Sequence, residues 1–575
     1  MFRYKDEYQR WLDSPSLSEA EWLELHEIGG NEGEIESRFF APLDFGTAGL
    51  RGIMGMGLHR MNVHVVRHAT QAFASVIKAE GESFAQKGVV ICYDCRRNSE
   101  AFAREAAAVM AANGIRVLIF DAMRPTPELS FAIRHYGAAG INITASHNPK
   151  DYNGYKVYWS DGAQLPPEHA AAIARAMGET DIFSGVSTMD FDEAVEKGLV
   201  RFIGAETDEA FLEKVLSQSI DRDVVARVAD RFKIVYTPFH GTGYKLVPEA
   251  LRRLGMKHIV PVPEQMVIDS DFSTVESPNP ENPESFYLAV GLAKKVGSDL
   301  IIGTDPDADR VGVMVRTPEG EYAGISGNQM GVLLLDYIIK ARKAAGTLPE
   351  NAAAIKTIVT TEMAREVALQ NGVHMDETFT GFKFMAEKVA EYERTGKYDC
   401  LMAYEESYGY MMGSYVRDKD AVTASVMIAE MAAHYFEKGM TLLQALESLY
   451  REYGWFGERT LNLLMPGLDG LEKMKSLMER LRAEPPKEIS GVRVVRMRDY
   501  LSGRISVSGL GVVGETEIRG SNVLYFELAD GTSLIVRPSG TEPKIKVYIL
   551  TRGESRSQCD QKLEKYEAFA RTLGA

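Results

Sequence analysis

The sequence predicts three similar α/β domains with mixed, largely parallel sheets, followed by a C-terminal α+β domain. Strands and helices alternate with the same plan in three successive stretches, which is typical of α/β domains. From about Glu458 onward, strand-like segments lie between two helices instead. A chain of 575 residues is also too long for one hydrophobic core. We expect domains at residues 1–204, 205–322, 323–457 and 458–575.

In the first domain, Trp11, Trp22 and Leu25 lie among many glutamates, which favours helices up to Phe40. The role of these helices is not evident from the sequence. Next comes a glycine-rich turn, Phe45 to Gly52, that contains Arg51. Hydrophobic patterning then predicts helices at residues 63–79, 99–113 and 126–136, and strands at residues 89–93, 116–120 and 141–144.

The second and third stretches repeat this plan. The second has predicted strands at residues 232–236, 258–262 and 300–303 and a helix at residues 284–296. The third has a helix at residues 328–345 and strands at residues 355–360 and 400–403. In the last part we expect a helix at residues 470–482, strands near Val492, Val523 and Leu534, and a closing helix.

Composition indicates an ordinary globular protein and does not exclude a small anionic substrate. Hydrophobic residues make up 45% and charged residues 25%, and the net charge is −16. This charge argues against nucleic acid or an anionic membrane as the main partner. No apolar run approaches the roughly 18 residues of a membrane span, and the first ten residues lack the apolar core of a signal peptide. We therefore expect a cytoplasmic protein.

Four cysteines imply no disulfide framework. Cys92 and Cys95 have C-x-x-C spacing, but Cys400 and Cys559 are solitary and complete no zinc quartet. Cys92 lies inside an apolar run, which favours a core position over redox or metal chemistry.

The first candidate site follows the strand at residues 141–144, in Thr144-Ala145-Ser146-His147-Asn148-Pro149. A strand that stops at Ser146 and His147, with Lys150 and Lys156 behind, presents a nucleophile among cations and suits phosphate chemistry. A polar loop after a strand explains this segment equally well on its own.

The second candidate is the loop Asp305-Pro306-Asp307-Ala308-Asp309-Arg310, which follows a predicted strand. Three alternate carboxylates on one loop can converge on Mg²⁺, which prefers oxygen ligands. An EF-hand is excluded, because Arg310 and Arg316 stand where its loop needs glycine and glutamate. The remaining alternative is an acidic turn that caps a helix.

Two further segments carry weaker signals. Arg537-Pro538-Ser539-Gly540-Thr541 offers a guanidinium, two hydroxyls and exposed backbone amides, which can hold phosphate oxygens, although a plain turn explains it as well. Glu405-Glu406-Ser407 places carboxylates and a hydroxyl at a strand end, where they suit sugar hydroxyls.

Other nucleotide and hydrolase motifs are excluded. Gly509 to Gly514 matches G-x-G-x-x-G, but strand-like sequence follows it, so no helix N-terminus would face a pyrophosphate. There is no P-loop, and no G-x-S-x-G elbow surrounds Ser146.

Together, these four segments resemble the motifs of the α-D-phosphohexomutase family, in that family's order and over nearly the whole chain. The resemblance implies a heart-shaped enzyme in which four domains, with one motif each, are arranged around a central cleft. It implies one Mg²⁺ per active site, small sugar phosphates as substrates, and glucose 1,6-bisphosphate as the activator. We expect a monomer or weak homodimer.

The resemblance also implies a role for each matching residue. Ser146 is similar to the phosphoserine of the family and also contributes a metal ligand, and Asp305, Asp307 and Asp309 are similar to its Mg²⁺ ligands. Arg51, His147 and Lys156 match catalytic positions near the transferred phosphate. The expected substrate-binding residues are Arg310, Lys383, Glu405, Ser407, Lys419, Arg537, Ser539, Gly540 and Thr541.

The implied reaction interconverts α-D-glucose 1-phosphate and glucose 6-phosphate through a phosphoserine enzyme. Glu405-Glu406-Ser407-Tyr408-Gly409 is more similar to the loop of phosphoglucomutases than to that of dual phosphomannomutases. Tyr404 and Tyr410 depart from that pattern, so mannose and pentose phosphates remain alternatives in that order. A Mg²⁺-dependent sugar phosphatase and a non-enzymatic sugar-phosphate sensor are the alternatives from other classes.

Overall fold

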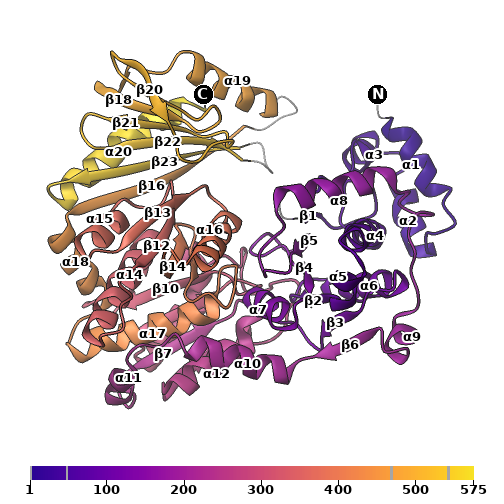
Figure 1. Ribbon diagram of the computed structural model, residues 1–575, viewed down its shortest axis with the longest axis horizontal. Helices are drawn as coiled ribbons and strands as arrows, with labels where there is room; N and C mark the ends of the chain where they lie inside the picture. The colour runs from indigo at the N-terminus through magenta and orange to yellow at the C-terminus, as the bar shows by residue number, and fades with distance from the viewer. Residues whose placement is uncertain (1–2, 47–48, 466–469, 540–543, 575) are drawn as a thin grey trace. The chain divides into compact units, whose positions relative to one another are not determined.

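The structure is a computed structural model that describes residues 3–46, 49–465, 470–539 and 544–574. These residues form two compact units. The first contains residues 3–325, 386–394 and 408–441, and the second contains the remaining described residues. The described residues form four β-sheets, of which two lie wholly in the first unit and the C-terminal one lies wholly in the second (Figure 1).

The first sheet of the first unit has the strand order β1-β5-β4-β2-β3-β6. Strands β4, β2, β3 and β6 run parallel, whereas β5 pairs antiparallel with both β4 and the edge strand β1. These strands are β1 (Gly49–Ile53), β2 (Val89–Tyr93), β3 (Val117–Phe120), β4 (Ala139–Ile143), β5 (Tyr152–Tyr158) and β6 (Val200–Ile203). The helices of this part are α1 (Tyr4–Leu12), α2 (Glu19–Glu27), α3 (Glu32–Phe39), α4 (Val63–Ala79), α5 (Glu82–Lys87), α6 (Ser99–Ala112), α7 (Thr126–Tyr136), α8 (Pro167–Glu179) and α9 (Phe191–Glu196).

The three N-terminal helices join the core of this domain. Trp11 of α1 and Phe39 of α3 are fully buried, and their rings meet edge to face. Burying aromatic rings of this size is strongly stabilising, so we assign the first forty residues a packing role.

The second sheet of the first unit has the order β11-β10-β9-β7-β8. Strands β8, β7 and β9 are parallel, and β10 and β11 are antiparallel. The elements are α10 (Ala205–Leu216), α11 (Arg222–Val228), β7 (Lys233–Thr237), α12 (Gly243–Leu254), β8 (His258–Pro261), η1 (Pro263–Gln265), η2 (Pro283–Phe286), α13 (Tyr287–Val296), β9 (Leu300–Thr304), β10 (Val311–Arg316), β11 (Tyr322–Ile325), β15 (Gly409–Met411) and α17 (Ala421–Glu437). Helix α17 packs on α11 and α12 (Figure 1).

The second unit begins with the parallel strands β13-β12-β14. Its elements up to the last sheet are α14 (Gly327–Ala344), β12 (Ala352–Thr357), α15 (Met363–Gln370), β13 (His374–Thr378), β14 (Asp399–Glu405) and α18 (Leu442–Tyr453). Helix α16 (Phe382–Thr395) has residues in both units.

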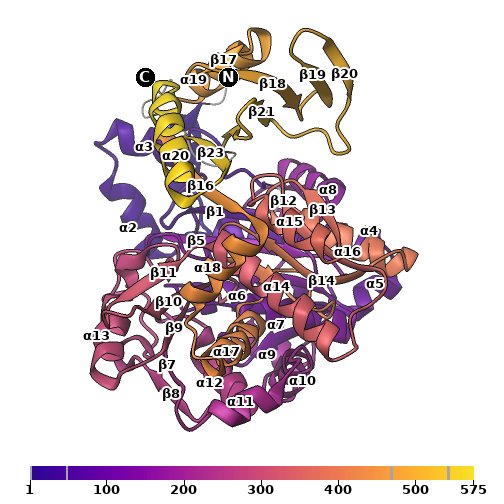
Figure 2. The same cartoon turned by 90° about the vertical axis from the view of Figure 1, so that its left-hand side faces the viewer.

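The C-terminal sheet is antiparallel, in the order β16-β23-β22-β21-β18-β19-β20, with β17 paired to β18. Figure 2 shows β19 and β20 as a hairpin that continues this sheet. The elements are β16 (Trp455–Leu464), α19 (Gly470–Ala483), β17 (Glu488–Ile489), β18 (Val492–Asp499), β19 (Arg504–Val507), β20 (Gly511–Glu515), β21 (Leu524–Leu528), β22 (Ser533–Pro538), β23 (Lys544–Gly553) and α20 (Arg556–Thr572).

The predicted fold class is confirmed, and five local predictions need correction. The strand expected at residues 355–360 is β12, which runs from Ala352 to Thr357. The predicted glycine-rich turn contains strand β1, because its glycines let β1 approach β5 closely. Strand β4 ends one residue before Thr144. The predicted helix at residues 284–296 starts with the 3₁₀ turn η2. Of the strand-like residues 515–528, only 515 and 524–528 are in strands.

Candidate active site

The backbone places Ser146 at the end of a strand, in a sharply bent loop. Ser146 follows β4 with φ = 51°, a left-handed conformation that non-glycine residues rarely adopt. Its N–H donates to Oγ1 of Thr144 at 2.8 Å. Its Oγ donates to Oδ2 of Asp305 at 2.8 Å and lies 3.2 Å from Nδ1 of His147. The strained turn therefore aims a buried hydroxyl at a carboxylate and an imidazole.

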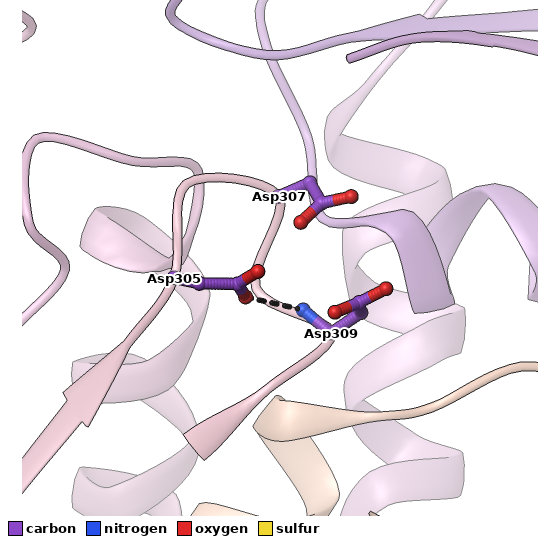
Figure 3. A group of neighbouring side chains, drawn as sticks. All are labelled: Asp305, Asp307 and Asp309. Atoms are coloured by element: carbon purple, nitrogen blue, oxygen red, sulfur yellow. Dashed lines mark hydrogen bonds between the residues drawn. The ribbon is translucent and has the colours of Figure 1, made fainter. Parts of the chain in front are cut away.

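The three aspartates of the second candidate loop converge, as Figure 3 shows. One carboxylate oxygen from each of Asp305, Asp307 and Asp309 lies within 4.8 Å of the others, and all three side chains are at most 2% exposed. Oδ1 of Asp305 accepts hydrogen bonds from the N–H groups of Asp309 at 3.1 Å and Arg310 at 3.0 Å. The loop after β9 is thus folded around its own first carboxylate.

This cluster fits a divalent cation. Oδ1 of Asp307 and Oδ1 of Asp309 are buried and have no hydrogen-bond partner, which is costly for carboxylate oxygens unless a cation binds them. Burial and the charges of Asp307 and Asp309 raise the pKa of Asp305 well above its usual range. Three hard oxygen donors on one short loop match the ligand preference of Mg²⁺.

Two lysines balance part of this negative charge. Nζ of Lys156, on β5, lies 2.9 Å from Oδ2 of Asp307, and Nζ of Lys419 lies 3.1 Å from Oδ2 of Asp309. Burial alone would raise the pKa of Asp307, but the charges of Lys156 and Lys419 lower it below its usual value. Asp307 is therefore ionised at neutral pH.

The imidazole beside the serine is held in its neutral form. Burial and the positive charges of Arg310 and Arg51 lower the pKa of His147 well below its usual value. A neutral imidazole can accept a proton, which a nucleophilic serine must lose.

The structure places the two arginines differently. Arg51 is exposed on β1, and its Nη1 donates to Oδ1 of Asn148 at 2.9 Å, so it joins the serine loop through that residue. Arg310 instead forms an ion pair with Glu281 at 2.5 Å.

Sequence patterns missed several residues that support the site. The N–H and Oγ1 of Thr126 donate to the backbone carbonyl and Oδ2 of Asp307, at 2.8 and 3.1 Å, and Asn142 donates to Oγ1 of Thr126 at 2.8 Å. Arg96 donates to the carbonyl of Ser146. Asp94 comes directly after β2, and Arg96 follows two residues later. This charged pair at the end of a strand is the sequence signal that could have pointed to Arg96.

In the second unit, the strand β14 ends at the acidic loop. Glu405 is 7% exposed, and Oε2 of Glu406 accepts hydrogen bonds from the hydroxyls of Thr357 at 3.1 Å and Thr360 at 3.2 Å. Glu406 thus ties the loop that carries Glu405 and Ser407 to the end of β12.

The two departures from the phosphoglucomutase pattern are core residues. Tyr404 and Tyr410 are fully buried, and the ring of Tyr404 packs against Gly331 of α14. Tyr404 therefore fills the interior between a strand and a helix.

The second unit also brings together two segments that contain predicted substrate-binding residues. Nη1 of Arg537, on β22, donates to Oγ1 of Thr380, in the segment that continues to Lys383. Nζ of Lys383 lies 4.9 Å from the ring centre of Phe384. The N–H of Ser539 donates to the carbonyl of Lys544 at 2.8 Å. Gly540 and Thr541 lie outside the described residues.

Comparison with known proteins matches all four domain models of one family. They are phosphoglucomutase/phosphomannomutase alpha/beta/alpha domains I, II and III and the C-terminal domain, at residues 42–182, 209–320, 326–453 and 474–558.

Several proteins that match this chain over most of its length are named phosphoglucomutases. A phosphoglucomutase from Staphylococcus saprophyticus is 34% identical over 96% of this chain and 98% of its own. One from Staphylococcus epidermidis is 36% identical over 88% of this chain and 90% of its own. The solved open form of parafusin, a phosphoglucomutase from Paramecium, has a TM-score of 0.67 with 18% identity, covering 92% of this chain and 93% of its own. The chain is an enzyme of the phosphoglucomutase/phosphomannomutase family.

Proposed function

We propose that the protein interconverts α-D-glucose 1-phosphate and glucose 6-phosphate through phosphorylated Ser146 and a glucose 1,6-bisphosphate intermediate. The observation that carries this proposal is the environment of Ser146, whose Oγ lies between a buried carboxylate at 2.8 Å and a neutral imidazole at 3.2 Å. A serine in such a place can lose its proton as its Oγ attacks phosphorus, and the phosphoserine that forms can later transfer the phosphoryl group to a sugar hydroxyl.

Asp305, Asp307 and Asp309 would hold one Mg²⁺, and an oxygen of phosphorylated Ser146 would complete its ligands. The ion would neutralise the charge that spreads over the phosphoryl oxygens during transfer. The unpartnered oxygens of Asp307 and Asp309 support this assignment.

The cations of the first unit would stabilise the transferred group. Lys156 reaches Oδ2 of Asp307, so its charge stands beside the metal ligands, and Arg51 is tied to the serine loop through Asn148. Fixed positive groups near developing negative charge lower the barrier to phosphoryl transfer. Lys419 and Arg310 would add to this potential, and Lys156 would also exchange a proton with the sugar hydroxyl.

Proton transfers would accompany each transfer of the phosphoryl group. When the bisphosphate rephosphorylates the enzyme, Oγ of Ser146 forms a bond to phosphorus and the bond between phosphorus and the sugar oxygen breaks. The serine proton moves to Nδ1 of His147, and the sugar oxygen takes a proton from Lys156. The contact of 3.2 Å between Oγ of Ser146 and Nδ1 of His147 supports the assignment of His147 as the acceptor.

In the second unit, Glu405 and Ser407 would bind the sugar hydroxyls. Lys383, Arg537, Ser539, Gly540 and Thr541 would bind the phosphate that is not transferred. The hydrogen bond from Arg537 to Thr380 supports a common role for these two segments. The bisphosphate must reorient between the two phosphoryl transfers, so this phosphate-binding site must accept either of its phosphates.

Glucose is the first choice of sugar. The relatives of similar length are named phosphoglucomutases, and the loop Glu405 to Gly409 has the phosphoglucomutase form. Mannose phosphates come second and pentose phosphates third. We further propose that glucose 1,6-bisphosphate activates the enzyme, and that it acts in the cytoplasm as a monomer or weak homodimer. Among the described residues, no helix has the length and apolar character to span a bilayer.

The test is an assay with glucose 1-phosphate, Mg²⁺ and trace glucose 1,6-bisphosphate. Wild type should form glucose 6-phosphate without releasing phosphate, and Ser146→Ala should lose activity by at least about 1,000-fold because the nucleophile is absent. Release of free phosphate would favour a phosphatase, and full turnover by Ser146→Ala would remove the assigned nucleophile. Mannose 1-phosphate and ribose 1-phosphate in parallel would rank the sugars.

A further inference from the structure

One buried arginine holds the loop that carries Ser146 through hydrogen bonds to backbone carbonyls. Arg96, 3% exposed, lies just after β2 and donates to the carbonyl of Ser146, to that of Asn148 at 2.5 Å, to that of Pro149 at 2.8 Å and to that of Tyr152 at 3.0 Å. Because a guanidinium presents its donors in a rigid planar fork, these contacts fix the carbonyls relative to one another.

Arg96 is itself held in place on several sides. Its Nε lies 3.3 Å from Oδ2 of Asp94, and the Oδ1 of Asp94 accepts hydrogen bonds from the N–H of Arg96 at 2.9 Å and the hydroxyl of Ser99 at 2.7 Å. The guanidinium also lies 5.2 Å from the ring centre of Phe272. The fork therefore has little freedom to turn.

These contacts determine where the nucleophile points. The backbone of Ser146 is fixed on both sides, at its N–H by Thr144 and at its carbonyl by Arg96. With φ = 51° maintained in this way, only rotation about χ1 remains to place Oγ, and Oγ lies 2.8 Å from Asp305. Strained conformations of this kind persist only where the surroundings enforce them.

The same side chain also positions a second group. Arg96 binds the carbonyl of Asn148, and Oδ1 of Asn148 accepts the hydrogen bond from Arg51. The guanidinium of Arg96 thus fixes the backbone of the loop. That backbone positions both the hydroxyl of Ser146 and the side chain of Asn148, which binds the exposed cation.

The geometry assigns Arg96 as the positioning residue of the serine loop, required for phosphoryl transfer to and from Ser146 without contacting the substrate. This assignment rests on the proposed function, because it presupposes that Ser146 carries the phosphoryl group. It predicts a loss in the rate of transfer with little change in substrate affinity, since the substrate-binding groups stay in place.

The test compares Arg96→Lys with Arg60→Lys as a matched control. Arg60 is also a buried arginine that donates to carbonyls, those of Ser37 at 3.0 Å and His59 at 3.2 Å, but it makes no contact with the serine loop. A lysine keeps the charge and loses the fork. The readouts are the rate at which glucose 1,6-bisphosphate phosphorylates Ser146, by rapid quench and mass spectrometry, with kcat, KM and the unfolding temperature.

Arg96→Lys should slow phosphorylation of Ser146 and kcat by about 100-fold, the effect of a misplacement near 1 Å. Its KM should change by less than about threefold. Arg60→Lys should lower the unfolding temperature and keep both rates within about threefold, as expected for a change remote from the reacting atoms. Asp94→Asn, which removes the ion pair and leaves the fork, should give an intermediate loss in rate.

Wild-type rates in Arg96→Lys, or an equal slowing in Arg60→Lys, would overturn the assignment. If Arg96→Lys does not fold, Asp94→Asn decides, and unchanged phosphorylation in that variant would overturn it too. Failure of the wild-type enzyme to accept phosphate from the bisphosphate would instead contradict the proposed function, so the two failures are distinguishable.

Discussion

At the scale of single residues, the site is a buried charge cluster in which lysines compensate two carboxylates, Lys156 that of Asp307 and Lys419 that of Asp309. Lys156 and Asp307 are 9% and 1% exposed and lie 2.9 Å apart. Charges this far from water are costly unless they remain paired. The cluster therefore links the stability of the first unit to the same groups that we propose for the chemistry.

Lys156→Met should destabilise the metal-free protein by about 3–5 kcal/mol, because it leaves the Asp307 carboxylate buried without its partner. Urea unfolding in the presence of a chelator measures this loss. The control is Lys197→Met, which removes an ion pair with Glu193 whose side chains are 55% and 50% exposed. That exposed pair should contribute at most about 1 kcal/mol. Equal losses in the two variants would show that Lys156 does not compensate Asp307.

The residue types and their spacing in the sequence predicted one part of this cluster, its three aspartates. Asp305, Asp307 and Asp309 alternate after a strand, so their convergence follows from the local chain. Arg96 could not be assigned in the same way, because its partners lie about fifty positions further along the chain and are backbone carbonyls, which leave no mark on the sequence.

At the scale of elements, the paired strands β1 and β5 position Lys156. Gly49 of β1 pairs with Lys156 of β5, and a Cβ on Gly49 would lie 2.0 Å from the carbonyl oxygen of Tyr155. Gly49 also has φ = 122°, a conformation that favours glycine. Only glycine lets the two strands pair at this point.

Gly49→Ala should therefore cost about 2–4 kcal/mol of stability and lower kcat, since it displaces the strand that carries Lys156. Gly178→Ala is the control, because Gly178 lies in α8 with no atom near the added methyl group. That change should stabilise the protein by about 0.5 kcal/mol. Thermal unfolding and activity report both effects, and a harmless Gly49→Ala would refute the close approach of β1 to β5.

A partly buried glutamate on β16 should make stability depend on pH. Burial raises the pKa of Glu458 to about 7, although Thr361 donates a hydrogen bond to it. As pH rises from about 4.5 to 7, the unfolded chain loses this proton while the folded chain keeps it. Stability should therefore fall over this range, by at most about 3 kcal/mol, and then stay level.

Glu458→Gln should flatten this dependence, which thermal unfolding at pH 5 and pH 8 would measure. The matched control is Glu515→Gln on the exposed strand β20. The unfolding temperature of this variant should depend on pH as that of the wild type does. A wild-type pH dependence in Glu458→Gln would mean that another group causes it.

Hydrophobic periodicity predicted strands β2, β3 and β4 of the first sheet but missed β1, β5 and β6. Strand β5 contains Asn153, Gly154 and Lys156 within a run that is buried almost throughout, so no alternation of polar and apolar residues marks it. Strand β1 is dominated by glycines that suggest a turn. Both depend on pairing with distant strands, which single-segment patterns do not record.

At the scale of the whole chain, the three α/β domains were predictable because their plan repeats, and the α+β domain was predictable because its strand-like segments lie between two helices. The roles of residues in the second unit rest on the family motifs, since Glu405 and Arg537 carry only weak signals alone. The metal site has a consequence for the stability of the whole protein, because a ligand that binds only the folded state stabilises it.

Mg²⁺ should raise the unfolding temperature of the wild-type protein, with a gain of about 2.7 kcal/mol at one hundred times the dissociation constant. Asp309→Asn should lose most of this gain, because it removes a charged ligand from the buried cluster. Asp192→Asn, at an exposed position on α9, should keep it. Thermal unfolding across a Mg²⁺ titration measures all three proteins, and an equal response of the two variants would place the ion elsewhere.

The central claim is that Ser146 carries the phosphoryl group, and peptide mass spectrometry tests it most directly. Enzyme treated with glucose 1,6-bisphosphate should carry one phosphoryl group on Ser146, and an excess of glucose 1-phosphate should remove it at a rate no slower than turnover. A phosphoryl group on another residue, or one on Ser146 that glucose 1-phosphate does not remove, would contradict the account.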